Sequence, residues 1–103
     1  MIVKQKILID TDIGDDIDDA IALALGLKLD GIEIVGVTTV FCNVTARAKI
    51  AKKILKLAGR GDVPVYAGSR NTLTKEKPND PLCQMTDEVL ADPSLCAENA
   101  ATA

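Results

Sequence analysis

Three short apolar runs alternate with two longer helical patterns over the first 70 residues. Residues 6–10 form an apolar run that leads into a cluster of Gly and Asp. Residues 32–40 are mostly apolar and β-branched, and residues 63–67 form a third short run. Runs of this length and composition, bounded by turn residues, are typical of buried strands.

The two stretches between these runs have the pattern of helices. Residues 18–29 are apolar on nearly all sides, which predicts a well-buried helix that is ended by Gly31. Residues 46–58 repeat apolar positions every four residues, with lysines on the other side. This pattern predicts an amphipathic helix with Thr45 as its N-cap and its end at Gly59.

The predicted order β-α-β-α-β indicates an α/β fold. Its connections suit crossover helices, so we expect an open, parallel, doubly wound Rossmann-like sheet with right-handed crossovers. A sheet of three strands leaves at least one edge unpaired, which indicates a fragment or a chain that needs a partner. From about Thr74 the periodicity is lost and prolines and polar residues dominate. We therefore divide the chain into a domain part, 1–73, and an irregular, unassigned tail, 74–103.

The net charge of −3 has a local origin. Six of the fifteen acidic residues lie within the ten positions 10–19, which leaves nine acidic against twelve basic residues elsewhere. These six are Asp10, Asp12, Asp15, Asp16, Asp18 and Asp19. A local cluster of carboxylates suits a cation and argues against nucleic acid or phosphate as the partner.

Composition and cysteine usage place the chain in a reducing compartment. With 103 residues it forms one domain at most. The chain has three cysteines, an odd number, and none of them form a C-x-x-C pair. Both observations favour reduced thiols. The first six residues are too polar for a signal peptide, and no apolar run reaches the ~20 residues of a membrane span. We expect a soluble, cytoplasmic protein that does not bind membranes.

The acidic window follows the first strand and runs into the first helix. Ligands of open α/β sheets bind at the carboxyl ends of strands, and a set of hard oxygen ligands favours Ca²⁺ or Mg²⁺ over Zn²⁺. The sequence contains no His. An EF-hand loop is rejected, because Asp15 and Ile21 stand where it needs Gly and Glu. Two alternatives stay open here: an aspartate-dependent phosphotransfer enzyme, and a solvated acidic loop followed by aspartates that favour a helix N-terminus.

The window resembles the amino-terminal signature of the inosine–uridine-preferring nucleoside hydrolases. Asp10-Thr11-Asp12, Gly14 and Asp18-Asp19-Ala20-Ile21-Ala22 match that signature, with two additional residues between Gly14 and the Asp-Asp pair. A second match is Val37-Thr38-Thr39-Val40-Phe41-Cys42-Asn43, with Cys42 where a Gly is usual. The segment 63–68 is similar to the family's third strand. The resemblance covers about 6–73.

The resemblance implies Ca²⁺-dependent hydrolysis of the N-glycosidic bond of ribonucleosides. Asp12 would be a calcium ligand and the general base, and Asp19 would be a second calcium ligand. Asp18 and Asn43 would bind the ribose, and Asp10 would support the ligating residues without contacting the metal itself. The alternative for Asn43 is a helix N-cap or a turn residue. Asp16, in the inserted part, would add a further calcium contact or lie in a solvated loop.

The same resemblance implies that parts of the site lie elsewhere. The family's domain is much longer, and its later part supplies another calcium ligand, further ribose contacts and, in many members, a histidine that protonates the leaving base. We therefore expect the chain alone to be inactive or weakly active. It would be a truncated non-catalytic fragment, or a subunit completed by a complementing chain or a second copy.

Overall fold

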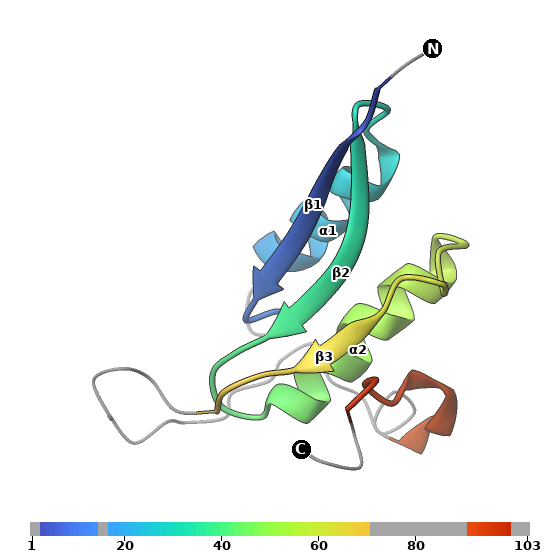
Figure 1. Cartoon of the computed structure of the whole chain (residues 1–103). Coiled ribbons are helices and arrows are strands. Elements are labelled where there is room, and N and C mark those ends of the chain that lie inside the picture. Colours follow the sequence, from blue (N-terminus) through green and yellow to red (C-terminus); the bar gives the residue numbers. More distant parts are fainter. Residues whose placement is uncertain (1–2, 15–16, 71–90, 100–103) are drawn as a thin grey trace.

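A parallel sheet of three strands, in the order β1-β2-β3, forms the centre of the computed structural model (Figure 1). The structure describes residues 3–14, 17–70 and 91–99. The elements in chain order are β1 (Gln5–Thr11), α1 (Ile17–Lys28), β2 (Ile32–Thr39), α2 (Val44–Leu57), β3 (Val65–Ala67) and the short 3₁₀ helix η1 (Pro93–Leu95). The predicted order β-α-β-α-β is confirmed.

The register brings the carboxyl ends of the three strands to one edge. Thr11, the last residue of β1, pairs with Thr39, the last residue of β2. Thr39 in turn pairs with Ala67, the last residue of β3. The loops that follow the strands therefore start side by side, which is where α/β sheets bind ligands.

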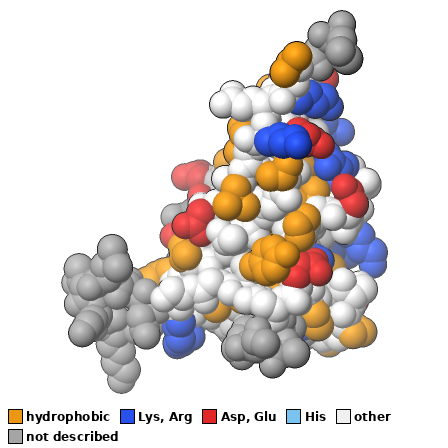
Figure 2. Space-filling model, in the orientation of Figure 1, with side chains coloured by type: hydrophobic (Ala, Val, Ile, Leu, Met, Phe, Trp, Pro, Cys, Tyr) orange, Lys and Arg blue, Asp and Glu red, His pale blue; other side chains and the backbone are white. Residues whose placement is uncertain are grey.

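Both helices lie on the same face of the sheet (Figure 1). Right-handed crossovers between strands in the order 1-2-3 require this arrangement. The expectation of a doubly wound sheet is therefore not met by the described residues. On the face away from the helices, Leu8, Val35 and Tyr66 are exposed, and hydrophobic side chains are visible along it in Figure 2.

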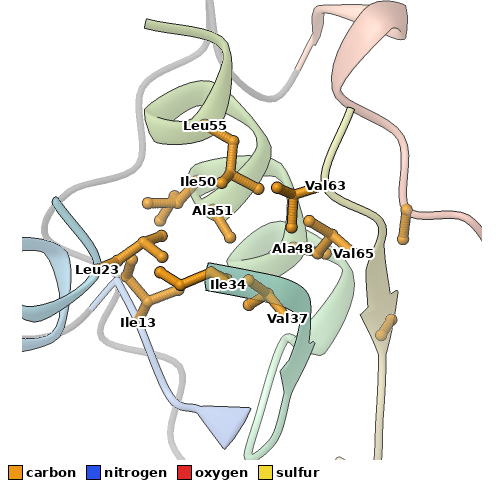
Figure 3. Packing of buried hydrophobic residues seen from close by; sticks show 12 residues of the cluster. Ile13, Leu23, Ile34, Val37, Ala48, Ile50, Ala51, Leu55, Val63 and Val65 are labelled. Carbon is orange, nitrogen blue, oxygen red and sulfur yellow. The ribbon is translucent and has the colours of Figure 1, made fainter. Parts of the chain in front are cut away.

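The core lies between this sheet and the two helices (Figure 3). Side chains from the loop after β1, from both helices and from β2 and β3 meet there; among them are Ile13, Leu23, Ile34, Val37, Ile50, Leu55 and Val65. All are aliphatic, as the scarcity of aromatic residues requires. Their burial supplies the main stabilisation of the fold.

The prediction that α1 is well buried is wrong for this structure. Only Leu23 of this helix is buried, whereas Ile17, Ile21 and Leu25 are each more than half exposed. These three positions are four residues apart, so they form one continuous apolar stripe. Among the described residues no element covers that stripe, which explains why an apolar sequence gives an exposed helix face.

Two predicted element boundaries are also corrected. Asn43, not Thr45, is the N-cap of α2, and its Oδ1 accepts a 3.1 Å hydrogen bond from Ala46 N. β3 begins at Val65 and not at residue 63. Pro64, just before it, has no N–H to donate, although its carbonyl accepts a 3.0 Å hydrogen bond from Val37 N.

Part of the segment predicted to be an irregular tail packs against the domain. Leu95 and Ala97 are buried, and Glu98 N donates a 2.7 Å hydrogen bond to Val65 O. Asn99 bonds both backbone groups of Ala67, accepting from its N at 2.9 Å and donating to its O at 2.8 Å. These bonds occupy part of the outer edge of β3. No helix in the described ranges has the length and apolar character that a bilayer crossing requires.

Candidate active site

Asp12 stands in the loop after β1, at the edge where the three strands end. Ile13, its neighbour, is fully buried in the core, whereas Asp12 is exposed. Gly14 follows with a φ of 122°, a conformation that residues with a Cβ rarely adopt. The loop therefore turns sharply: Ile13 anchors it, and the Asp12 carboxyl is left at the surface of the strand edge.

The carboxyl groups of Asp12 and Asp19 are hydrogen-bonded to each other. Asp19 lies in the first turn of α1, where the helix dipole favours a negative charge. The hydrogen bond from Asp12, followed by one from Thr11, lowers the pKa of Asp19. The same bond raises the pKa of Asp12, and desolvation raises it further. Of the two carboxyl groups, that of Asp12 therefore gains a proton more readily than that of Asp19.

Thr11 fixes one half of this pair. Its Oγ1 donates a 2.7 Å hydrogen bond to Asp19 Oδ2, and Thr11 itself is buried. The bond joins the last residue of β1 to the first turn of α1. The sequence indicated no role for Thr11, although its place between Asp10 and Asp12 in the acidic window was a signal.

The other predicted site residues are less closely associated with this pair. Asp10 Oδ1 accepts a 2.8 Å hydrogen bond from Thr38 Oγ1, which ties β1 to β2. Asp18 is exposed in the first turn of α1, and Asn43 is an exposed N-cap of α2. Asp15 and Asp16 lie outside the described residues.

The loop between β2 and α2 has an unusual backbone. Phe41 and Cys42 have φ values of 74° and 61°, in the left-handed region that residues with a Cβ avoid. Phe41 N and Cys42 N each donate a 2.9 Å hydrogen bond, to Ser69 O and Arg70 O in the segment after β3. Such strained conformations are concentrated at functional sites and persist only where surrounding contacts impose them.

Arg47 connects this loop to the loop after β1. The side chain extends from the first turns of α2, is fully buried, and donates to carbonyl oxygens of Asp12, Ile13 and Phe41. Sequence reasoning missed this residue. The available signal was a charged residue in the apolar stripe of α2, one turn before Ile50 and Ala51.

This arrangement suits a divalent cation bound by oxygen ligands. Two adjacent carboxylates can both contact one metal ion, and their oxygens are hard ligands. Within the described ranges, however, no three acidic, His or Cys side chains converge on one point. If this edge held a calcium ion, Asp12 and Asp19 would supply only part of the six to eight oxygens that calcium takes, and other groups would complete the set.

Sequence comparison identifies the family. A sequence model of the inosine-uridine preferring nucleoside hydrolases matches residues 7–99, which include every site residue described above. The chain belongs to this family. The match argues against the phosphotransfer alternative, and it extends past residue 73 to the segment that packs on β3.

Individual nucleoside hydrolases agree with this assignment. The chain is 37% identical over 98 residues to the probable uridine nucleosidase 2 of Arabidopsis thaliana, covering 93% of this chain and 29% of that protein. It is 40% identical over 76 residues to the pyrimidine-specific ribonucleoside hydrolase RihA of Photobacterium profundum, covering 72% and 24%.

A solved structure shows the same fold. A plant nucleoside hydrolase, the PpNRh1 enzyme, superposes with a TM-score of 0.60 at 38% identity, over 70% of this chain and 23% of that one. This confirms the predicted open α/β architecture. The chain spans about a quarter of the length of the nucleoside hydrolases it matches.

Proposed function

We propose that this chain carries part of a Ca²⁺-dependent active site that hydrolyses the N-glycosidic bond of ribonucleosides, releasing ribose and the free base. The observation that supports this most is the convergence of Asp12 and Asp19 at the carboxyl edge of the sheet. Family membership supports the reaction class, because its named members are nucleosidases and ribonucleoside hydrolases.

Each acidic residue would have a distinct role. Asp12 and Asp19 would hold the calcium ion, and the hydrogen bond from Thr11 would keep Asp19 ionised and oriented for that purpose. Asp18, exposed beside the pair, would accept a hydrogen bond from a ribose hydroxyl. Asp10 would support the strand edge through its bond with Thr38.

The side chain of Asn43 can act both as the cap of α2 and as a ligand of the sugar. Its Oδ1 already accepts the Ala46 N–H as the cap of α2, whereas its side-chain N–H₂ group can still donate. We propose that this amide group donates to the sugar while the oxygen keeps the cap.

The chemistry follows from these positions. A bound calcium ion would lower the pKa of a water molecule in the site. Asp12 would take a proton from the attacking water as the water oxygen bonds to the anomeric carbon. The base would leave with the electron pair of the broken N-glycosidic bond and take up a proton from solvent. The carboxylates would stabilise the positive charge that develops on the sugar ring in an oxocarbenium-like transition state.

Calorimetric titration of the purified chain with Ca²⁺ tests the metal half of the proposal. We expect binding by the wild-type chain and a loss of at least about tenfold in affinity in Asp12→Asn and in Asp19→Asn. Asp62→Asn is the matched control, because Asp62 is exposed and its carboxylate accepts hydrogen bonds from the Arg60 side chain, away from the Asp12 and Asp19 pair. Equal binding by all four proteins would contradict the proposed calcium ligands.

A nucleoside hydrolysis assay tests the catalytic half. The described residues present an uncovered apolar stripe on α1, and β1 forms a sheet edge, which favours a requirement for a complementing segment. We therefore expect the chain alone to hydrolyse uridine or inosine slowly or not at all. Rapid turnover by the purified chain would show that no complementing part is needed.

A further inference from the structure

Arg47 makes hydrogen bonds to two separate loops at the strand edge. Its Nη1 donates to Asp12 O at 2.6 Å and to Ile13 O at 3.0 Å, both in the loop after β1. Its Nε donates to Phe41 O at 2.7 Å, in the loop after β2. The guanidinium carbon also lies 5.8 Å from the centre of the Phe41 ring, within the range of a cation–π contact.

The burial of this side chain indicates a role beyond filling space. Arg47 is 0% exposed and is the largest fully buried side chain in the described residues. Burying a guanidinium is costly, and an apolar side chain could fill a similar volume without that desolvation. What an apolar residue cannot provide is a rigid, planar set of N–H donors that reaches three carbonyl oxygens at once.

The two loops that Arg47 joins carry the site. One begins with Asp12, and the other contains the strained residues Phe41 and Cys42 and leads into Asn43. Bonds from Phe41 N and Cys42 N hold the second loop to the segment after β3. Beyond the end of the β1–β2 ladder, the Arg47 bonds and a 3.0 Å bond from Val40 N to Thr11 O connect this part of the strand edge.

We propose that Arg47 is a positioning residue that fixes the loop of Asp12 against the loop of Phe41 to Asn43. By holding the backbone of Asp12, it sets where the Asp12 carboxyl meets Asp19. The effect of Arg47 on metal binding rests on the proposed function of Asp12 and Asp19. Its effect on the positions of the two loops does not depend on that function. Arg47 would touch neither metal nor substrate and would act through the backbone of Asp12.

The test compares Arg47→Met and Arg47→Lys with the wild-type chain by amide hydrogen exchange measured by NMR. We expect Phe41 and Cys42 amides to exchange about tenfold faster in Arg47→Met, while Ala51 and Leu55 in the middle of α2 keep their exchange rates. Arg47→Lys, which keeps the charge but lacks the planar fork, should give a smaller increase. Arg60→Met is the control, because Arg60 is a surface arginine that bonds Asp62.

Calcium affinity is the second measurement on the same variants. We expect a fall of about tenfold in Arg47→Met, less in Arg47→Lys and none in Arg60→Met. Unchanged exchange at Phe41 and Cys42 would overturn the proposal, and so would equally faster exchange through the whole of α2, which indicates a general loss of stability. If Arg47→Met does not fold, the comparison of Arg47→Lys with Arg60→Met decides by the same criteria. If the wild-type chain binds no calcium, the proposed function fails, whereas hydrogen exchange still decides the role of Arg47.

Discussion

Thr11 Oγ1 lies 2.7 Å from Asp19 Oδ2, so the last residue of β1 holds a carboxylate in the first turn of α1. This bond lowers the pKa of Asp19, after the larger effect of the bond from Asp12. It therefore favours the ionised form that a metal ion requires. The Thr11 hydroxyl thus links the end of β1 to the ionisation of Asp19.

Thr11→Val tests this connection. The substitution keeps the side-chain shape and removes the donor, so we expect calcium affinity to fall about tenfold and stability to fall by ~1 kcal/mol. Calorimetry and urea denaturation measure the two effects. Thr45→Val, at an exposed position of α2, is the control and should change neither quantity appreciably. A calcium affinity equal to that of the wild type would show that the hydrogen bond from Thr11 to Asp19 does not contribute to calcium binding.

The cap of α2 gives a second prediction. Asn43 Oδ1 accepts from Ala46 N, so Asn43→Ala should lower the free energy of unfolding by ~1 kcal/mol. Asn43→Asp and Asn43→Ser keep a capping oxygen and should remain close to the wild type. Chemical denaturation followed by circular dichroism measures all three. A similar loss in Asn43→Asp would mean that the amide group, and not the cap, matters for folding.

Sequence patterns predicted most of this fold, because short strands and an amphipathic helix have distinct periodicities. The same patterns overestimated the burial of α1. An apolar helix face indicates that another element packs on it, but the pattern does not identify that element. Ile21 and Leu25 are exposed among the described residues. Asp12 and Asp19 were predicted as site residues through a motif. Arg47 and Thr11 were not, because their roles depend on contacts between elements that no local pattern encodes.

The exposure of α1 leads to a third prediction, from two leucines of the same helix. Leu23 is 1% exposed and belongs to the core, whereas Leu25 is 57% exposed. Leu23→Ala should therefore lower the free energy of unfolding by ~2–5 kcal/mol, because it removes buried contacts and leaves a cavity. Leu25→Ala should change it by no more than ~0.5 kcal/mol.

Urea denaturation of the two variants makes the comparison direct, since both replace the same residue type in the same helix. If Leu25→Ala were as damaging as Leu23→Ala, the outer stripe of α1 would have to be covered in solution. Sedimentation at several protein concentrations would then show whether a second copy of the chain covers it.

The ion pair between Lys52 and Glu98 gives a prediction about pH. It links α2 to the segment beyond η1, and its partners are 14% and 40% exposed. The hydrogen bond from Lys52 holds the pKa of Glu98 below its ordinary value of 4.5. A carboxylate with a lowered pKa in the folded state stabilises that state fully above its unfolded pKa, and this contribution is lost as the pH falls through the folded pKa.

Glu98→Gln should therefore cost no more than ~0.2–1 kcal/mol at pH 7, because solvent screens a partly exposed pair. Well below pH 4.5 the difference from the wild type should vanish. A double-mutant cycle of Glu98→Gln and Lys52→Met isolates the interaction energy of the pair from the effects of each side chain alone. Urea denaturation at pH 7 and well below pH 4.5 measures the free energies of unfolding for the cycle. Since Glu98 N also bonds Val65 O, the backbone attachment to β3 remains in every variant. A coupling energy that is the same at both pH values would mean that Lys52 and Glu98 do not interact as an ion pair.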